Sequence, residues 1–159
     1  MPPHIAFRIS VPFGLLAWGT VTALYIWPEL RGIALTDAVR PLLVLHSFRY
    51  LGLAFLVPGV VSPELPAAFA RPAALGDIVS ALLALLALLA LGSAVGTTLV
   101  WVFNLWGSAD LLFAFYNGAR LVRAGKLKAT HFGAAYFIPT FYVPLLLITH
   151  GMIFRILLR

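Results

Sequence analysis

Two ionisable side chains stand deep inside apolar runs of this sequence. Arg49 lies within the run from Pro41 to Val61, and Asp110 lies within the run from Leu75 to Gly118. A charged group near the middle of a bilayer costs about 2.5–3.5 kcal/mol on insertion scales, so such groups face the protein interior and find a partner. We therefore expect an ion pair between Arg49 and Asp110, acting as a structural clamp or as part of a site.

Two histidines are expected near this pair. His46 precedes Arg49 by three residues, so both project from one face of a helix. At 1.5 Å per residue, His46 and His150 both lie roughly 8 Å from the midplane on the same side, and Asn104 falls at a similar height. Imidazoles at matched depth on different helices could bind one ligand between them. Alternatively, each could hydrogen-bond a neighbouring helix.

Further polar groups extend this candidate site. Trp106, Asp110 and Asn117 fall within about 40° of one another on a helical wheel, and Tyr142 lies in the last apolar run. The residues that we expect to bind a ligand are His46, Arg49, Asn104, Trp106, Asp110, Asn117, Tyr142 and His150.

Other kinds of chemistry are not supported. The chain has no cysteine, which excludes disulfides and thiolate metal sites. It has no phosphate-binding loop, no H-E-x-x-H and no G-x-S-x-G motif, so no catalytic residue is assigned. Because Asp110 is the single acid expected at membrane depth, a mechanism based on two carboxylates is excluded.

The composition indicates that these residues are positioned by membrane helices. Of the 159 residues, 62% are hydrophobic and 10% are charged, against about 25% charged in soluble domains. A spanning helix needs about 20 apolar residues. The run from Leu75 to Gly118 would be about 66 Å long as one helix, so it must fold back near Gly92–Gly96. We expect one all-α transmembrane domain, residues 1–159, with five helices at about 10–27, 41–61, 77–91, 97–117 and 132–158.

The basic residues predict an orientation. The formal charge is +6, and the lysines and arginines stand mostly at the ends of apolar runs, where they suit anionic lipid headgroups rather than nucleic acid. Six of them would lie on the cytoplasmic side of an inner membrane and four outside, with the N-terminus inside and the C-terminus outside. The cytoplasmic six are Arg8, Arg71, Arg120, Arg123, Lys126 and Lys128.

Three functions fit these features. The leading interpretation is a membrane protein whose polar site, between the second, fourth and fifth helices, binds or conducts a proton, an ion or a small ligand. The second is an electron-transfer protein with haem b, in which His46 and His150 are the axial metal ligands. The third is an accessory subunit of a larger membrane complex. A fourth, a membrane enzyme acting on lipid or isoprenoid substrates with His46 as acid–base, has no identifiable partner residue. The expected partners are the lipid bilayer, a small ligand or ion, and other copies of the chain or a larger complex.

Overall fold

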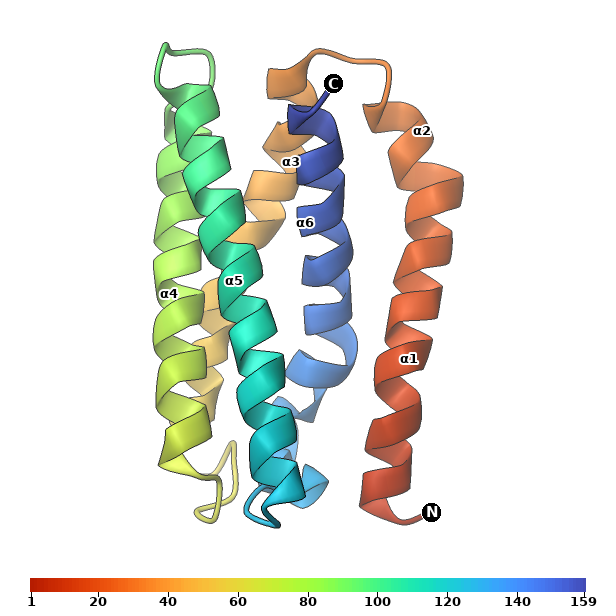
Figure 1. Ribbon diagram of the computed structural model, residues 1–159, viewed down its shortest axis with the longest axis vertical. Coiled ribbons are helices and arrows are strands. Elements are labelled where there is room, and N and C mark those ends of the chain that lie inside the picture. The colour runs from red at the N-terminus through yellow and green to blue at the C-terminus, as the bar shows by residue number, and fades with distance from the viewer.

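The computed structural model describes residues 1–159, and they form a bundle of helices (Figure 1). Five helices are long and apolar enough to cross a membrane, which confirms the prediction of an all-α multi-pass protein. Two of them are regular helices, α4 (Ala67–Leu89) and α5 (Gly96–Arg123).

The other three spans each change helix type along their length. The first joins α1 (Pro3–Val21), the π-helical turn η1 (Thr22–Ile26) and α2 (Trp27–Leu30). The second joins α3 (Leu35–Ser47) to the 3₁₀ helix η2 (Phe48–Leu56). A short 3₁₀ segment, η3 (Ala129–Tyr136), precedes the last span, which consists of the π-helical η4 (Ile138–Tyr142) and α6 (Val143–Leu157).

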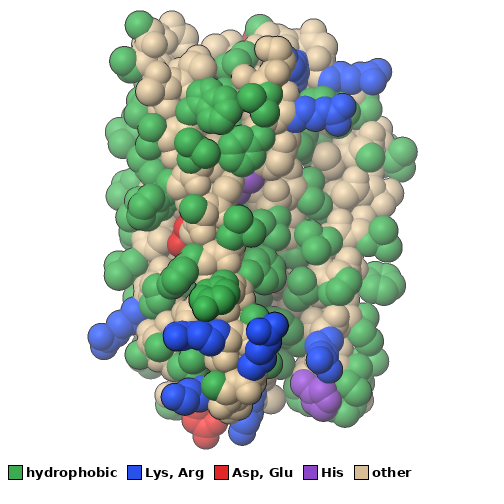
Figure 2. Space-filling model, viewed as in Figure 1, with side chains coloured by type: hydrophobic (Ala, Val, Ile, Leu, Met, Phe, Trp, Pro, Cys, Tyr) green, Lys and Arg blue, Asp and Glu red, His purple; other side chains and the backbone are tan.

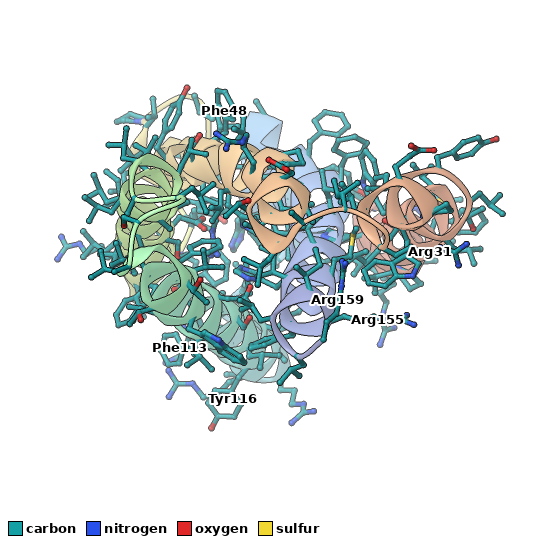
Figure 3. The ribbon with its side chains drawn as sticks, turned by 90° about the horizontal axis from the view of Figure 1, so that it is seen from above. Arg31, Phe48, Phe113, Tyr116, Arg155 and Arg159 are labelled. Carbon is teal, nitrogen blue, oxygen red and sulfur yellow. The ribbon has the colours of Figure 1, made fainter.

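Four spans surround a common interior, and the first stands to one side. Seen from above, α3, α4, α5 and α6 form a closed ring, while α1 lies outside it (Figure 3). The first span packs mainly on η3, η4 and α6, and no residue of α1 itself is buried. Large apolar side chains such as Phe48, Phe113 and Tyr116 point away from the ring, as expected where lipid is the solvent.

The helix boundaries differ from the predicted ones where proline is tolerated inside a helix. The second span begins at Leu35 rather than near 41, and Pro41 lies within α3. The first span runs from Pro3 to Leu30 rather than from about 10 to 27. It passes Pro28 through the η1 turn, in which the Trp27 N–H bonds to the Thr22 carbonyl, and a π-turn is a known way to absorb such an interruption.

The largest correction concerns α4, which begins at Ala67 rather than near 77. Pro72 lies inside this helix and has no N–H to offer the Ala68 carbonyl. The Asn117 side-chain amide of α5 donates to that carbonyl at 2.7 Å instead. A partner on another helix therefore allows α4 to continue past its proline, and Asp77 becomes a mid-helix residue.

The chain breaks at glycines elsewhere. The reversal between α4 and α5 contains Gly92 with φ +86°, which confirms the predicted turn at Gly92–Gly96. The predicted last helix, 132–158, is interrupted by a kink inside the short segment η3, where Gly133 has φ +50°. The last span therefore begins at Ile138, and α5 extends to Arg123 rather than 117.

Five spans place the two termini at opposite ends of the bundle (Figure 1). The end that carries the N-terminus also carries the start of α4 and the end of α5, and hence all six basic residues predicted to be cytoplasmic. Arg31, Arg40, Arg155 and Arg159 belong to the other end. Both ends show exposed lysine or arginine, with an apolar belt between them (Figure 2). We call the two ends the N-terminal end and the C-terminal end.

Candidate functional site

The helix type of η2 aims one arginine into the ring. A 3₁₀ helix has three residues per turn, so residues three apart share a face. Arg49, Gly52 and Phe55 follow this spacing and are all buried, whereas Tyr50, Leu51 and Leu56 are exposed. His46, three residues before Arg49, continues the same buried face from α3.

The Arg49 side chain is completely buried and binds all three other helices of the ring. Its Nε donates to Asp77 Oδ1 of α4 at 2.8 Å, and its Nη2 donates to Asp110 Oδ2 of α5 at 2.7 Å. Its Nη1 donates to the Gly107 carbonyl at 3.2 Å and to His150 Nε2 of α6 at 3.1 Å. The predicted Arg49–Asp110 ion pair is thus confirmed, within a larger network.

Three glycines make room for this network. A Cβ on Gly52 would collide with the Asp77 carboxylate, and one on Gly76 would collide with the Asp110 carboxylate. A Cβ on Gly107 would lie 2.6 Å from His150 Cε1 and 2.8 Å from Arg49 Nη1. Each polar side chain is therefore held against the bare backbone of a neighbouring helix.

The bonds around His150 determine which of its nitrogens carries the proton. Since Arg49 Nη1 can only donate, His150 Nε2 must accept. The proton is then on Nδ1, which lies 2.7 Å from Asn104 Oδ1, and the Asn104 amide donates to the His150 carbonyl at 3.3 Å. His150 is accordingly a neutral imidazole held between Arg49 and Asn104.

His46 has a different set of partners. Its Nε2 lies 3.0 Å from Thr149 Oγ1, whose own proton goes to the Leu145 or Leu146 carbonyl. Nε2 is therefore the donor, and the buried Nδ1 is an acceptor without any partner.

The two imidazoles do not fit the haem interpretation. The rings of His46 and His150 are in contact, with their centroids 4.2 Å apart. Axial ligands must stand on opposite faces of a macrocycle, so touching rings leave no space for one. Both Nε2 atoms are also engaged, with Thr149 and Arg49. These residues therefore suit a hydrogen-bonded network rather than metal ligation.

The structure separates two expected site residues from this cluster. Trp106 is 46% exposed on the outer surface of α5, and Asn117 binds the Ala68 carbonyl nearer the N-terminal end. Tyr142 lies beside the cluster, where its hydroxyl donates to the Leu45 carbonyl at 3.2 Å. The gathered residues of the predicted set are His46, Arg49, Asn104, Asp110 and His150.

Asp77 is the member of the cluster that sequence reasoning missed. The predicted helix 77–91 begins at Asp77, but α4 places this residue near mid-helix, with 11% of its side chain exposed. A predicted helix that began next to Pro66, rather than after Pro72, would have placed Asp77 near its middle. The expectation of a single acid at membrane depth is therefore wrong, because Asp77 and Asp110 both bind Arg49.

A pocket of about 660 Å³ reaches both carboxylates from the N-terminal end. Along α5 it extends from Val122 to Asp110, a distance of about 18 Å at 1.5 Å per residue. Its walls are mainly apolar and come from α1, η2, α4, α5 and the segment from Leu127 to Val143 at the start of α6. Basic side chains stand at its outer part, namely His4, Arg8 and Lys128.

The C-terminal half of the ring is filled by packed side chains. Twelve buried apolar residues form one cluster there, including Val39, Leu43, Phe103, Ile153 and Ile156. Phe103 covers both imidazoles, with ring centroids 5.0 Å from His46 and 5.3 Å from His150. The carboxylates are therefore approached from the N-terminal half.

Comparison with known proteins places the chain in one family. Residues 6–158 match the family described as "Domain of unknown function (DUF8737)", and the chain belongs to it. No curated protein and no solved structure matches the chain.

Proposed function

We propose that this member of the family binds a small amphipathic molecule within the membrane, with the polar end of that molecule at Asp77 and Asp110. The observation that carries the proposal is the pocket, which ends at the two carboxylates of the buried network. Largely apolar pockets with a few convergent polar groups are the usual form of small-molecule sites.

The walls favour an apolar or aromatic body. Phe7 of α1, Phe69 of α4, Phe115 of α5 and Phe132 of η3 all line the pocket. Phe7 stacks on Phe132 with centroids 5.5 Å apart, and Phe69 meets Phe132 edge to face, also at 5.5 Å. Such rings offer a large apolar area to a ligand with little loss of side-chain freedom.

The inner end of the pocket favours a hydrogen-bond donor or a positive charge. Asp77 and Asp110 each give one oxygen to Arg49, and no protein group donates to Asp77 Oδ2 or Asp110 Oδ1. Arg49 itself is 0% exposed and does not line the pocket. A ligand therefore meets acceptors, so an anion competing for Arg49 is disfavoured by this geometry.

The access route favours binding over conduction. The pocket occupies the N-terminal half of the ring, and the packed cluster around Phe103 fills the other half. We accordingly propose entry and exit through one leaflet.

The proposal is tested by filling the pocket. Ala114 lines the pocket, whereas Ala109 lies about 1.4 turns away on α5, is exposed and does not line it. Ala114→Trp and Ala109→Trp are therefore a matched pair. The probe is diphenylhexatriene, a neutral apolar fluorophore, excited by energy transfer from tryptophan in detergent-purified protein. We expect saturable binding to the wild type and to Ala109→Trp.

Binding should weaken at least tenfold in Ala114→Trp. Mass analysis of lipids that co-purify with the three proteins provides a second readout, in which one species should be lost from Ala114→Trp alone. Equal probe binding and equal co-purified lipid in all three proteins would remove the proposal.

A further inference from the structure

The charges of the buried network do not balance. One guanidinium, Arg49, faces two carboxylates, Asp77 and Asp110. The bonds of His150 make it neutral, and His46 donates to Thr149 through one nitrogen and has no partner at the other. With both acids ionised, the network carries one excess negative charge in a region with little water, which is strongly unfavourable.

We infer that the site takes a monovalent cationic amphiphile, which replaces a single proton shared by Asp77 and Asp110. This inference rests on the proposed function and names the chemical class of its ligand. In the empty site, one proton on the carboxylate pair neutralises the network, as in other sites where two acids are held together. In the occupied site, the positive charge of the ligand does so.

The exchange is balanced in atoms and charge. A ligand cation enters the pocket, the O–H bond of the protonated carboxyl group breaks, and the proton leaves to water at the N-terminal end. The ligand then rests against two carboxylates and one guanidinium with no net charge. One proton is released for each cation bound, and no oxidant or further reactant is needed.

The titratable groups around the carboxylates come from several elements. In the ring, Arg49 binds both acids, His150 binds Arg49, His46 packs on His150, and Tyr142 donates to the Leu45 carbonyl. The outer part of the pocket contributes His4, Arg8 and Lys128. Among the ring groups, Arg49 is the only fixed charge, and its guanidinium is already shared between the two acids. No cation of the protein is therefore left to balance the second carboxylate at this depth.

The surroundings favour a lipophilic cation over a metal ion. Arg8 and Lys128 at the outer part of the pocket repel hydrated cations, and no group of three or more ligating side chains exists to hold a metal. Both α1 and α5 line the pocket, and α1 packs on α6, η3 and η4. The route that we infer for a lipophilic ligand is therefore from lipid between α1 and α5. The phenylalanine rings of the pocket also attract a cation through their faces.

The test uses two probes of nearly equal size and opposite charge, tetraphenylphosphonium and tetraphenylborate. We expect the purified wild-type protein to bind the cation at least tenfold more tightly than the anion. In weakly buffered solution with a pH indicator, about one proton should appear per cation bound. By linkage, the apparent Kd for the cation should then fall about tenfold for each unit rise in pH while the pair is protonated.

Asp110→Asn and Asp77→Asn each leave Arg49 with one carboxylate and a balanced charge. Both variants should lose the preference for the cation and release no proton, yet still bind diphenylhexatriene. Wild-type protein that binds diphenylhexatriene but shows equal affinity for the two ions, or no proton release, overturns this inference and leaves the proposed function standing. If diphenylhexatriene binding also fails, the proposed function fails with it.

Discussion

Gly76 of α4 lies so close to Asp110 of α5 that a single methyl group on its Cα would occupy the position of the carboxylate. The same relationship joins Gly52 to Asp77. In each case the absence of a side chain on one element lets an acid from another reach Arg49. The polar network thus depends on small residues as much as on charged ones.

Replacing these glycines by alanine should therefore disturb the network. Gly76→Ala and Gly107→Ala each force a buried polar group to move. We expect each substitution to lower the free energy of unfolding by about 1–3 kcal/mol, as for other overpacked interiors. Thermal melting in detergent measures this loss. Gly151→Ala is the control, because a Cβ at this position meets nothing within 4 Å. The substitution also replaces a flexible residue in a helix by a better helix former. Equal melting of Gly76→Ala and Gly151→Ala would contradict the close approach.

Arg49 should be the most sensitive position of the fold. Arg49→Ala leaves two buried carboxylates without their partner, and breaking such a pair costs about 3–5 kcal/mol. Arg49→Lys keeps the charge, but a lysine cannot bind both acids, Gly107 and His150 together. Arg49→Lys should therefore lose less stability than Arg49→Ala. The triple variant Arg49→Met, Asp77→Asn, Asp110→Asn removes every charge and should recover most of the stability. A triple variant as unstable as Arg49→Ala would show that shape, and not charge, holds this region.

The sequence predicted the ion pair because membrane depth is a strong constraint on charge. Counting 1.5 Å per residue was enough to bring Arg49 to Asp110, and His46 to His150, since helix rise varies little. The same counting failed for Asp77. It depends on where a helix starts, and α4 starts before Pro72 through a bond from Asn117 that no local pattern reveals. Trp106 was misplaced for a related reason, since angular position on one helix does not say which faces meet protein and which meet lipid.

The topology can be tested directly, because the chain has no cysteine of its own. Ala94 lies in the exposed turn between α4 and α5, and Ala124 lies in the exposed turn after α5. The prediction from the basic residues is that a membrane-impermeant maleimide labels Ala94→Cys in intact cells and labels Ala124→Cys after the cells are lysed. The opposite pattern would invert the orientation, and labelling of both in intact cells would contradict a span between them.

The bond between Asn117 and the Ala68 carbonyl explains how α4 tolerates Pro72, and it can be tested by a double-mutant cycle. Asn117→Ala leaves that carbonyl unpaired, which should cost about 1–3 kcal/mol. Pro72→Ala restores an N–H that bonds the carbonyl within the helix, so Asn117→Ala should cost much less in that background. The four melting temperatures measure the coupling. Additive effects would mean that water, rather than Asn117, donates to the Ala68 carbonyl. In that case α4 would continue past Pro72 without a hydrogen bond from α5.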